Sequence, residues 1–229
     1  MQPTILVISL PGSKRRDNVI NRLVGYGLNF SFIDGVNGNL INLNAPEVPI
    51  DVSYCKTHWG HSINNGEIGC AMSHIKCYEY IVKKNIPEAI ILEDDFHLDE
   101  NFKMIISAIQ EKAPKRREIT FLFHGKAKAW PIKRKLYNEF NLVRYRYPSK
   151  KSKRAIIGAV AYMLTLDGAK KLLNIAYPIR MPADYLTGYI QRNKLHAYGV
   201  EPCCVSITNV PSEIDSISKR NYGTHIENE

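Results

Sequence analysis

Three consecutive carboxylates follow an apolar run in the first half of the 229-residue chain. Residues 89–92 are all apolar, which is typical of a buried strand, and Glu93, Asp94 and Asp95 come directly after them. Three such groups repel one another and cannot be desolvated unpaired. Mg²⁺ or Mn²⁺ binds oxygen ligands of this kind and often bridges to substrate phosphates. The residues predict a metal–diphosphate site, and the alternative is a solvated acidic turn.

Three further polar side chains are expected at the same edge of the protein. Arg15 and Arg16 open a helix directly after the first predicted strand, and Asp34 ends the second. Ligands of open α/β sheets bind at the carboxyl ends of the strands. Guanidinium groups there could hold a diphosphate bidentately, and Asp34 could bind a ribose hydroxyl. A solvated basic pair and a turn aspartate are the plainer alternatives.

Two predicted helices begin with further residues that could belong to a binding or catalytic site. His74 lies in the first turns of a predicted helix over residues 67–84 that opens with small residues, and with Glu67 and Ser73 it is a candidate to line a pocket. Asp184 follows Pro182 at another helix start, where an aspartate is either a cap or a general base for an acceptor hydroxyl.

One loop combines cations with aromatic residues. Single-stranded nucleic acid, anionic lipid headgroups and a phosphorylated saccharide all suit such a patch, as does plain solvation of a basic loop. These alternatives stay open from the residues alone. The loop comprises Arg144, Tyr145, Arg146, Tyr147, Lys150, Lys151, Lys153 and Arg154.

The elements that must position these groups alternate between strand and helix. This order predicts an α/β protein with a parallel sheet and helices on its faces. Residues 40–65 are irregular and are expected to form a long loop. Besides the strand at 89–92, the expected strands lie at 4–10, 29–34, 119–124, 142–147, 155–165 and 195–200. The expected helices lie at 14–25, 67–84, 101–112, 167–175 and 184–192.

Composition narrows the class of protein. Lys and Arg number 31 against 22 Asp and Glu, and the net charge of +9 favours an anionic partner. Residues 1–10 lack the basic start of a signal peptide, and the longest nearly apolar stretch, 155–166, is shorter than the roughly 20 residues that span a bilayer. The protein is therefore expected to be cytoplasmic, or peripheral at a membrane.

The sequence lacks the patterns that are typical of several kinds of site and enzyme. The five cysteines are irregularly spaced, which favours reduced thiols, and the run Cys55-x-x-His58-x-x-His61 lacks a second ligand pair for zinc. No P-loop, G-x-G-x-x-G or G-x-S-x-G motif is present. Kinase, nucleoside triphosphatase, dinucleotide oxidoreductase and nucleophile-elbow hydrolase functions are therefore disfavoured.

Taken together, these segments resemble glycosyltransferase family 25, which includes lipopolysaccharide and lipooligosaccharide biosynthesis transferases and the collagen galactosyltransferase domain. The resemblance spans residues 4–202, and it departs at Gly35, Asn37 and Ala159, where the family more often has alanine, aspartate and threonine. The most specific blocks are Gly66-Glu67-Ile68-Gly69-Cys70-Ala71-Met72-Ser73-His74 and Ile91-Leu92-Glu93-Asp94-Asp95. Looser ones are Ile8-Ser9-Leu10 with Arg15-Arg16, Phe32-Ile33-Asp34-Gly35-Val36-Asn37-Gly38, Gly158-Ala159-Val160-Ala161-Tyr162 and Pro182-Ala183-Asp184-Tyr185-Leu186.

The resemblance implies a GT-A type fold with a Rossmann-like, mostly parallel central sheet flanked by helices. It implies one domain over 1–229, with a donor-nucleotide half at 1–112, an acceptor half at 113–205 and a tail at 206–229 that closes over the donor. It also implies inverting transfer of galactose or glucose from a UDP-sugar to a lipooligosaccharide or lipopolysaccharide acceptor.

The same resemblance assigns roles to residues. Glu93-x-Asp95 corresponds to the acidic metal motif for Mn²⁺ or Mg²⁺, with Asp95 the first choice as ligand and Asp94 beside it. Asp184 is the expected base. The expected diphosphate contacts are Arg15, Arg16, Lys219, Arg220 and His225, of which His225 is also a candidate metal ligand.

Two other functions compete with this one. A nucleotidyltransferase also uses metal-bound carboxylates on an α/β sheet. A basic module that binds nucleic acid or a membrane surface would leave the acidic cluster purely structural, although the resemblance makes nucleic acid an unlikely partner.

Overall fold

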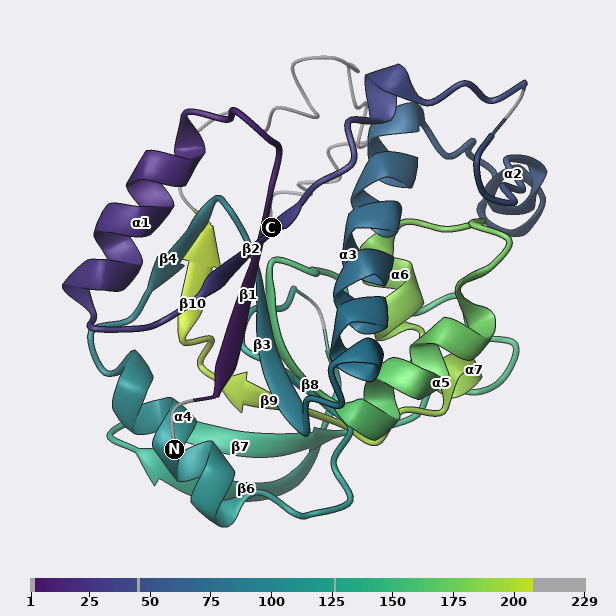
Figure 1. Ribbon diagram of the computed structural model, residues 1–229. Helices are drawn as coiled ribbons and strands as arrows, with labels where there is room; N and C mark the ends of the chain where they lie inside the picture. The colour runs from purple at the N-terminus through teal and green to yellow at the C-terminus, as the bar shows by residue number, and fades with distance from the viewer. Residues whose placement is uncertain (1–2, 45, 126, 208–229) are drawn as a thin grey trace, which may run out of the picture.

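The computed structural model describes residues 3–44, 46–125 and 127–207 and has the predicted α/β architecture (Figure 1). The strands are β1 Thr4–Ser9, β2 Ser31–Asp34, β3 Glu88–Glu93, β4 Phe96–Leu98, β5 Ile119–Phe121, β6 Ala129–Tyr137, β7 Phe140–Tyr145, β8 Ala161–Thr165, β9 Ala197–Glu201 and β10 Val205–Ile207. The helices are α1 Arg15–Gly25, α2 Ser53–Trp59, α3 Asn65–Lys83, α4 Phe102–Lys112, α5 Leu166–Ala176, α6 Ala183–Gly188 and α7 Ile190–Asn193, with a 3₁₀ turn, η1, at Gly38–Leu40.

One eight-stranded sheet runs through the molecule in the order β2-β1-β3-β8-β5-β9-β7-β6. The pairs β1–β2, β1–β3 and β5–β9 are parallel, and β8 and β7 are antiparallel to their neighbours. All the other strands of this sheet therefore point the same way, which confirms the predicted mostly parallel sheet. The short strands β4 and β10 pair separately.

Helices cover both faces of the sheet, and the alternation of side chains in the strands accounts for this (Figure 1). In β1, Leu6 and Ile8 pack into the core beneath α3, α5, α6 and α7. Ile5 and Val7 point the other way, into the core formed with α1 and α4. A strand buried on both faces needs a continuous apolar run, which is what the sequence has at β1 and β3.

The start of α3 is fixed by its cap and by a close backbone contact. Asn64 and Glu67 form a capping box, in which each side chain accepts a hydrogen bond from the other's N–H. A Cβ on Gly69 would lie 2.6 Å from the carbonyl oxygen of Val36, and one on Gly38 would lie 2.0 Å from that of Asn65. The glycines on both sides of this contact therefore let the turn after β2 pack directly on the start of α3.

Three predicted elements are wrong or incomplete. The strand expected at 155–165 is confined to Ala161–Thr165, because residues 155–160 leave the sheet with Gly158 at φ 116°. The loop expected at 40–65 contains η1 and α2. The helix expected at 184–192 is two short helices, since the chain turns at Tyr189.

The strand β6 was missed altogether. Its residues are mostly exposed, so the strand has no apolar period to reveal it.

The described cysteines all carry free thiols, as the sequence predicted. Cys55 is buried, and its thiol donates to the carbonyl oxygen of Arg180, while His58 Nδ1 lies 3.0 Å from the carbonyl oxygen of Tyr54. No helix in the described ranges combines the length and apolar character needed to cross a membrane.

Candidate functional site

The acidic residues lie at the carboxyl end of β3, a central strand of the sheet that borders the parallel group β2-β1-β3. The β3 strand pairs with β1 on one side and β8 on the other, and Glu93 N–H donates to the carbonyl oxygen of Val160 at 2.8 Å. Asp94 and Asp95 form the turn that leads into β4. The carboxylates thus lie at the edge where ligands of α/β sheets bind.

Asp94 is held by two neighbours. Its carboxylate accepts a hydrogen bond from Ser9 Oγ at 2.6 Å and forms an ion pair with Arg15 Nη1 at 3.0 Å. The side chains of Arg15 and Asp94 are only 15% and 12% exposed. Arg15, predicted to contact a diphosphate, therefore anchors the acidic turn to the start of α1.

Arg16 makes a second pair across the same edge. Its guanidinium donates to the carbonyl oxygen of Ser9 at 2.9 Å and to Asp34 Oδ1 at 2.5 Å, and it stacks over the ring of Phe32. Asp34 is 66% exposed. The carboxyl ends of β1, β2 and β3 thus bring together the arginines and carboxylates that the sequence singled out.

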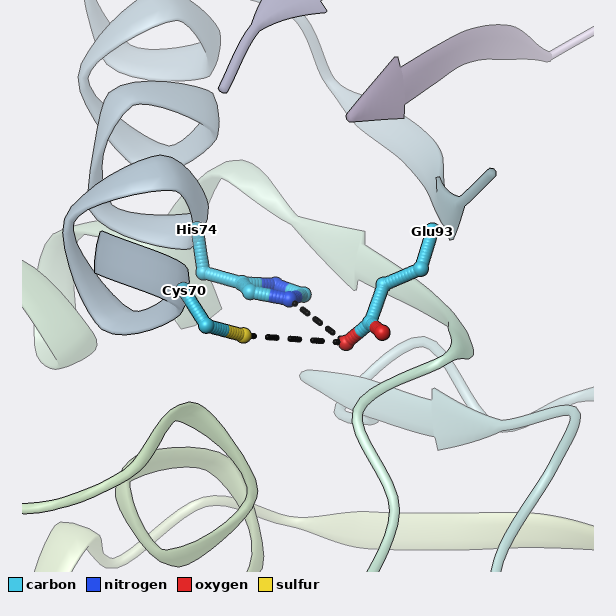
Figure 2. Close-up of side chains that lie close together, drawn as sticks. All are labelled: Cys70, His74 and Glu93. Carbon is cyan, nitrogen blue, oxygen red and sulfur yellow. Dashed lines mark hydrogen bonds and ion pairs between the residues drawn. The ribbon is translucent and has the colours of Figure 1, made fainter. Parts of the chain in front are cut away.

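Glu93 points away from this network, towards α3 (Figure 2). His74 Nε2 lies 3.1 Å from Glu93 Oε1, and the thiol of Cys70 lies 3.9 Å from the same oxygen. Their ligand atoms lie within 4.8 Å of one another. Cys70 and His74 are four residues apart, so both face the end of β3 from one side of the helix.

A buried chain of hydroxyl groups continues behind His74. His74 Nδ1 lies 2.7 Å from the hydroxyl of Tyr162, which lies 3.0 Å from that of Tyr78. A carboxylate only accepts, so a neutral His74 carries its proton on Nε2 and accepts at Nδ1 from Tyr162. Tyr78 then donates to Tyr162. The chain fixes the imidazole that faces Glu93, and burial raises the pKa of Tyr162.

The carboxyl group of Asp95 has a pKa that is clearly raised in the folded protein. Burial, and then the charges of Glu93 and Asp94, raise its pKa from 3.8 to about 6, against a smaller opposing effect of Arg15. Burial thus disfavours the charged form of Asp95, and the repulsion from Glu93 and Asp94 adds to this effect.

A divalent cation bound here would stabilise the charged forms of these carboxylates. Carboxylate oxygens are the ligands that Mg²⁺ and Mn²⁺ prefer, so Asp95 and Glu93 have suitable donor atoms for such an ion. Among the described residues, however, the three-residue group whose ligand atoms lie within 4.8 Å of one another consists of Cys70, His74 and Glu93 and does not include Asp95. The thiol of Cys70 and the imidazole of His74 are softer donors, which suit zinc better, and His74 is already engaged by Glu93 and Tyr162. The assignment of the metal to Glu93 and Asp95 stays a prediction.

Two residues predicted to line the donor pocket form hydrogen bonds within the protein that stabilise the fold. Ser73 is 3% exposed, and its hydroxyl accepts from Val36 N–H and donates to the carbonyl oxygen of Gly69. Glu67 closes the capping box of α3. Their roles in donor binding stay predictions, while His74 is buried in the wall of the site.

Asp184 lies in the first turn of α6, which packs beside α3 (Figure 1). Its neighbour Tyr185 lines a cavity of about 710 Å³ that also takes in much of the basic loop. The remaining candidates, Lys219, Arg220 and His225, lie outside the described residues, as does the tail from residue 208 onwards.

Sequence reasoning missed two members of the site. Tyr162 lies in a block that the resemblance matched, but nothing local marks its hydroxyl as a partner of His74. Cys70 was read as a plain thiol, although its spacing of four from His74 on a predicted helix was a usable signal.

Residues 2–187 match the family described as glycosyltransferase family 25 (LPS biosynthesis protein). Procollagen galactosyltransferase 2 of Mus musculus is 23% identical in an alignment of 247 residues that covers 98% of this chain and 38% of the relative. The inactive glycosyltransferase 25 family member 3 of Homo sapiens is 25% identical over 190 residues, covering 79% and 30%. The chain thus spans 38% or less of these relatives.

Among solved structures, a glycosyltransferase involved in the glycosylation of the major capsid of PBCV-1 aligns with a TM-score of 0.39 and 10% identity, covering 78% of this chain and 68% of that one. The family match covers most of the chain and includes the acidic turn, the start of α3 and Asp184. The protein therefore belongs to glycosyltransferase family 25.

Proposed function

We propose that the protein transfers galactose or glucose from a UDP-sugar to a lipooligosaccharide or lipopolysaccharide saccharide, with inversion at the anomeric carbon and with Mn²⁺ or Mg²⁺ bound. The observation that carries the proposal is the crowding of carboxylates at the end of β3, where the pKa of Asp95 is raised to about 6. An acceptor of this kind suits a cytoplasmic protein that meets an anionic membrane surface through its basic residues.

The chain's own groups would orient the donor. Glu93 and Asp95 would hold the cation, which when bound neutralises charge on the leaving diphosphate. The hydrogen bond from His74 fixes the carboxylate of Glu93, and Arg15 with Ser9 fixes the turn that carries Asp95. Both supports lie on helices or strands, so the carboxylates are held in place before the donor arrives.

Asp184 would act on the acceptor. In an inverting transfer, the acceptor oxygen forms a bond to the anomeric carbon while the bond to the leaving UDP breaks, and the hydroxyl proton passes to a base. The carboxylate of Asp184 would take that proton. Its place in α6, next to the cavity wall at Tyr185, is consistent with this role.

Thermal unfolding with UDP, UDP-galactose and UDP-glucose, each with and without Mn²⁺, tests the donor. We expect UDP to raise the Tm, and to raise it further when Mn²⁺ is present. Release of UDP from the UDP-sugar would then show activity, which matters because some relatives are named inactive. If no uridine nucleotide shifts the Tm under any metal condition, the donor assignment is wrong.

Two substitutions separate the assigned roles. Asp95→Asn should weaken the Mn²⁺-dependent part of UDP binding. Asp184→Asn should leave UDP binding unchanged and lower transfer by about 100-fold or more, since general-base catalysis typically contributes 10²–10⁴-fold. Asp167→Asn, in the exposed first turn of α5, is the matched control and should change neither. Loss of UDP binding in Asp184→Asn would contradict the role of a base.

A further inference from the structure

The cavity of about 710 Å³ beside α6 is basic and partly aromatic. The carboxylates of the acidic turn do not line it, and the function proposed above does not assign it a ligand. Its volume falls in the range of small-molecule sites, about 300–1,000 Å³. Its charged and aromatic lining residues are Lys128, Arg146, Lys153, Arg154, Tyr147 and Tyr185.

Within the part of the chain that the structure describes, no carboxylate balances the positive charge of this cavity. None of the described residues that line it is acidic. Among the ion pairs of the described residues, none includes Lys128, Arg146, Lys153 or Arg154. Arg146 Nε is buried, and no described residue accepts its hydrogen bond. Four cations that gather around one hollow without a carboxylate favour an anionic ligand.

The segments that carry these cations are held in place. Gln191 Nε2, on α7, donates to the carbonyl oxygens of Ser152 and Arg154 at 3.1 and 2.8 Å, so the backbone around Lys153 is fixed. The guanidinium of Arg146 lies over the ring of Trp130, 4.7 Å from its centroid. A charged site with fixed backbone and stacked side chains is more selective than a mobile basic loop.

The rest of the wall suits a sugar ring. The hydroxyl of Tyr147 donates to the carbonyl oxygen of Leu195, which fixes the ring against the cavity. Ile156 and Ile157 add apolar surface. Pyranose rings present C–H groups on their faces and hydroxyl groups at their edges, and an aromatic wall with a few polar groups matches both.

The chain segment 155–160 runs from the wall of the cavity to the end of β3. Ile156 and Ile157 line the cavity, and Val160, three residues further on, accepts the hydrogen bond of Glu93 N–H. From α6, the cavity is lined by Tyr185, which directly follows Asp184, and by Gly188, which lies so close to Ile156 that a Cβ would be 1.8 Å from its carbonyl oxygen. A ligand here would contact the helix that carries the expected base.

We propose that this cavity binds the acceptor, and that the acceptor carries a phosphate or carboxylate near the sugar unit that receives the hexose. This inference rests on the proposed transferase function. It adds that the acceptor is anionic, and it names the residues that bind the anionic group. The half-buried Arg146 and the exposed Lys153 and Arg154 bind the anion, and Tyr147 packs against the sugar.

Single-stranded nucleic acid fits the same charges less well. Such ligands need a groove that follows the backbone over several nucleotides, with bases stacked in succession. The cavity instead has apolar walls at Ile156, Ile157 and Ile190 and closes against α6 and α7. The shape therefore favours a short saccharide.

Isothermal titration calorimetry with glucose 6-phosphate, glucuronate, glucose and inorganic phosphate tests the proposal. We expect the two anionic sugars to bind at least tenfold more tightly than glucose, and glucose 6-phosphate to bind more tightly than phosphate alone. Arg146→Gln and Lys153→Gln should each weaken glucose 6-phosphate binding by about tenfold, as loss of a charge-assisted hydrogen bond predicts. Lys135→Gln, an exposed charge on β6, should change it less than twofold.

The thermal shift with UDP and Mn²⁺, measured on the same variants, separates this inference from the proposed function. Unchanged UDP binding with lost glucose 6-phosphate binding supports an acceptor site distinct from the donor site. UDP binding without any preference for anionic sugars would overturn the inference and leave the donor assignment standing. An equal loss in all three lysine and arginine variants, or tighter binding of an oligonucleotide than of the sugars, would also overturn it.

Discussion

Replacing Asp95 by asparagine should make the protein less sensitive to pH and more stable at neutral pH. Burial and the carboxylates of Glu93 and Asp94 raise the pKa of Asp95 from 3.8 to about 6, while Arg15 lowers it less. The charged form is therefore disfavoured in the folded protein. Asparagine keeps the shape of the side chain and removes the charge.

The sign and size follow from proton linkage. Between about pH 4 and pH 6 the folded chain keeps a proton on Asp95 that the unfolded chain has released, so the free energy of unfolding falls as the pH rises. Each pKa unit is worth 1.36 kcal/mol, so a rise from 3.8 to about 6 gives a loss of roughly 3 kcal/mol at most, complete by about pH 7. Asp95→Asn should recover most of it there.

Urea unfolding from pH 4.5 to 7.5, with a chelator present, measures this directly. The wild type should lose stability relative to Asp95→Asn across that range, whereas Asp167→Asn, in the exposed first turn of α5, should stay parallel to the wild type. Mn²⁺ should then stabilise the wild type more than Asp95→Asn, because binding to the folded state adds to its stability. Parallel pH curves for wild type and Asp95→Asn would refute the reasoning.

Two further variants test how the site is supported. Gly69→Ala places a Cβ 2.6 Å from the carbonyl oxygen of Val36 and should cost about 1–3 kcal/mol in urea unfolding, whereas Gly25→Ala, with open space around it, should change stability by less than about 1 kcal/mol. Equal effects would mean that the close contact is not a constraint. Tyr162→Phe removes the hydroxyl that binds His74 and should cost about 1–3 kcal/mol, because both partners are buried. An unchanged unfolding curve would mean that the hydroxyl chain does not stabilise the site.

The first half of the fold could be predicted because its patterns are local. The strands β1 and β3 are uninterrupted apolar runs, and α3 combines a capping box with helical spacing of its buried residues. Each of these signals lies within about twenty residues. The order strand, helix, strand then places the parallel strands side by side.

The second half could not be predicted in the same way, because burial there comes from distant parts of the chain. Residues 155–160 are apolar but lie against Gly125 and α6 instead of in the sheet. An apolar run of this length cannot distinguish a buried strand from a buried irregular segment. The strand β6 was missed for a different reason: it pairs with β7, but its apolar residues Trp130 and Ile132 are exposed, so no alternation of apolar and polar residues marks it.

In the site, too, some contacts could be predicted from local patterns and others depend on distant parts of the chain. That Arg15, Arg16, Asp34 and Asp94 lie together follows from the rule that parallel strands end at one edge. The contact of His74 with Tyr162 depends instead on β8 being inserted antiparallel between β3 and β5, a pairing across about 70 residues that no local spacing encodes.

The pairs at the edge of the sheet also show that the two arginines predicted to bind a diphosphate are not equivalent. The pair of Arg16 and Asp34 is exposed on the Asp34 side, and exposed ion pairs contribute about 1 kcal/mol or less, so a phosphate could replace Asp34 as partner at small cost. Arg15 and Asp94 are both largely buried and are joined by Ser9. Moving Arg15 to a ligand would leave the Asp94 carboxylate with one neutral partner beside two more carboxylates. Arg16 is therefore the stronger candidate for direct contact with the donor, and loss of UDP binding in an Arg15 variant would report a disturbed acidic turn.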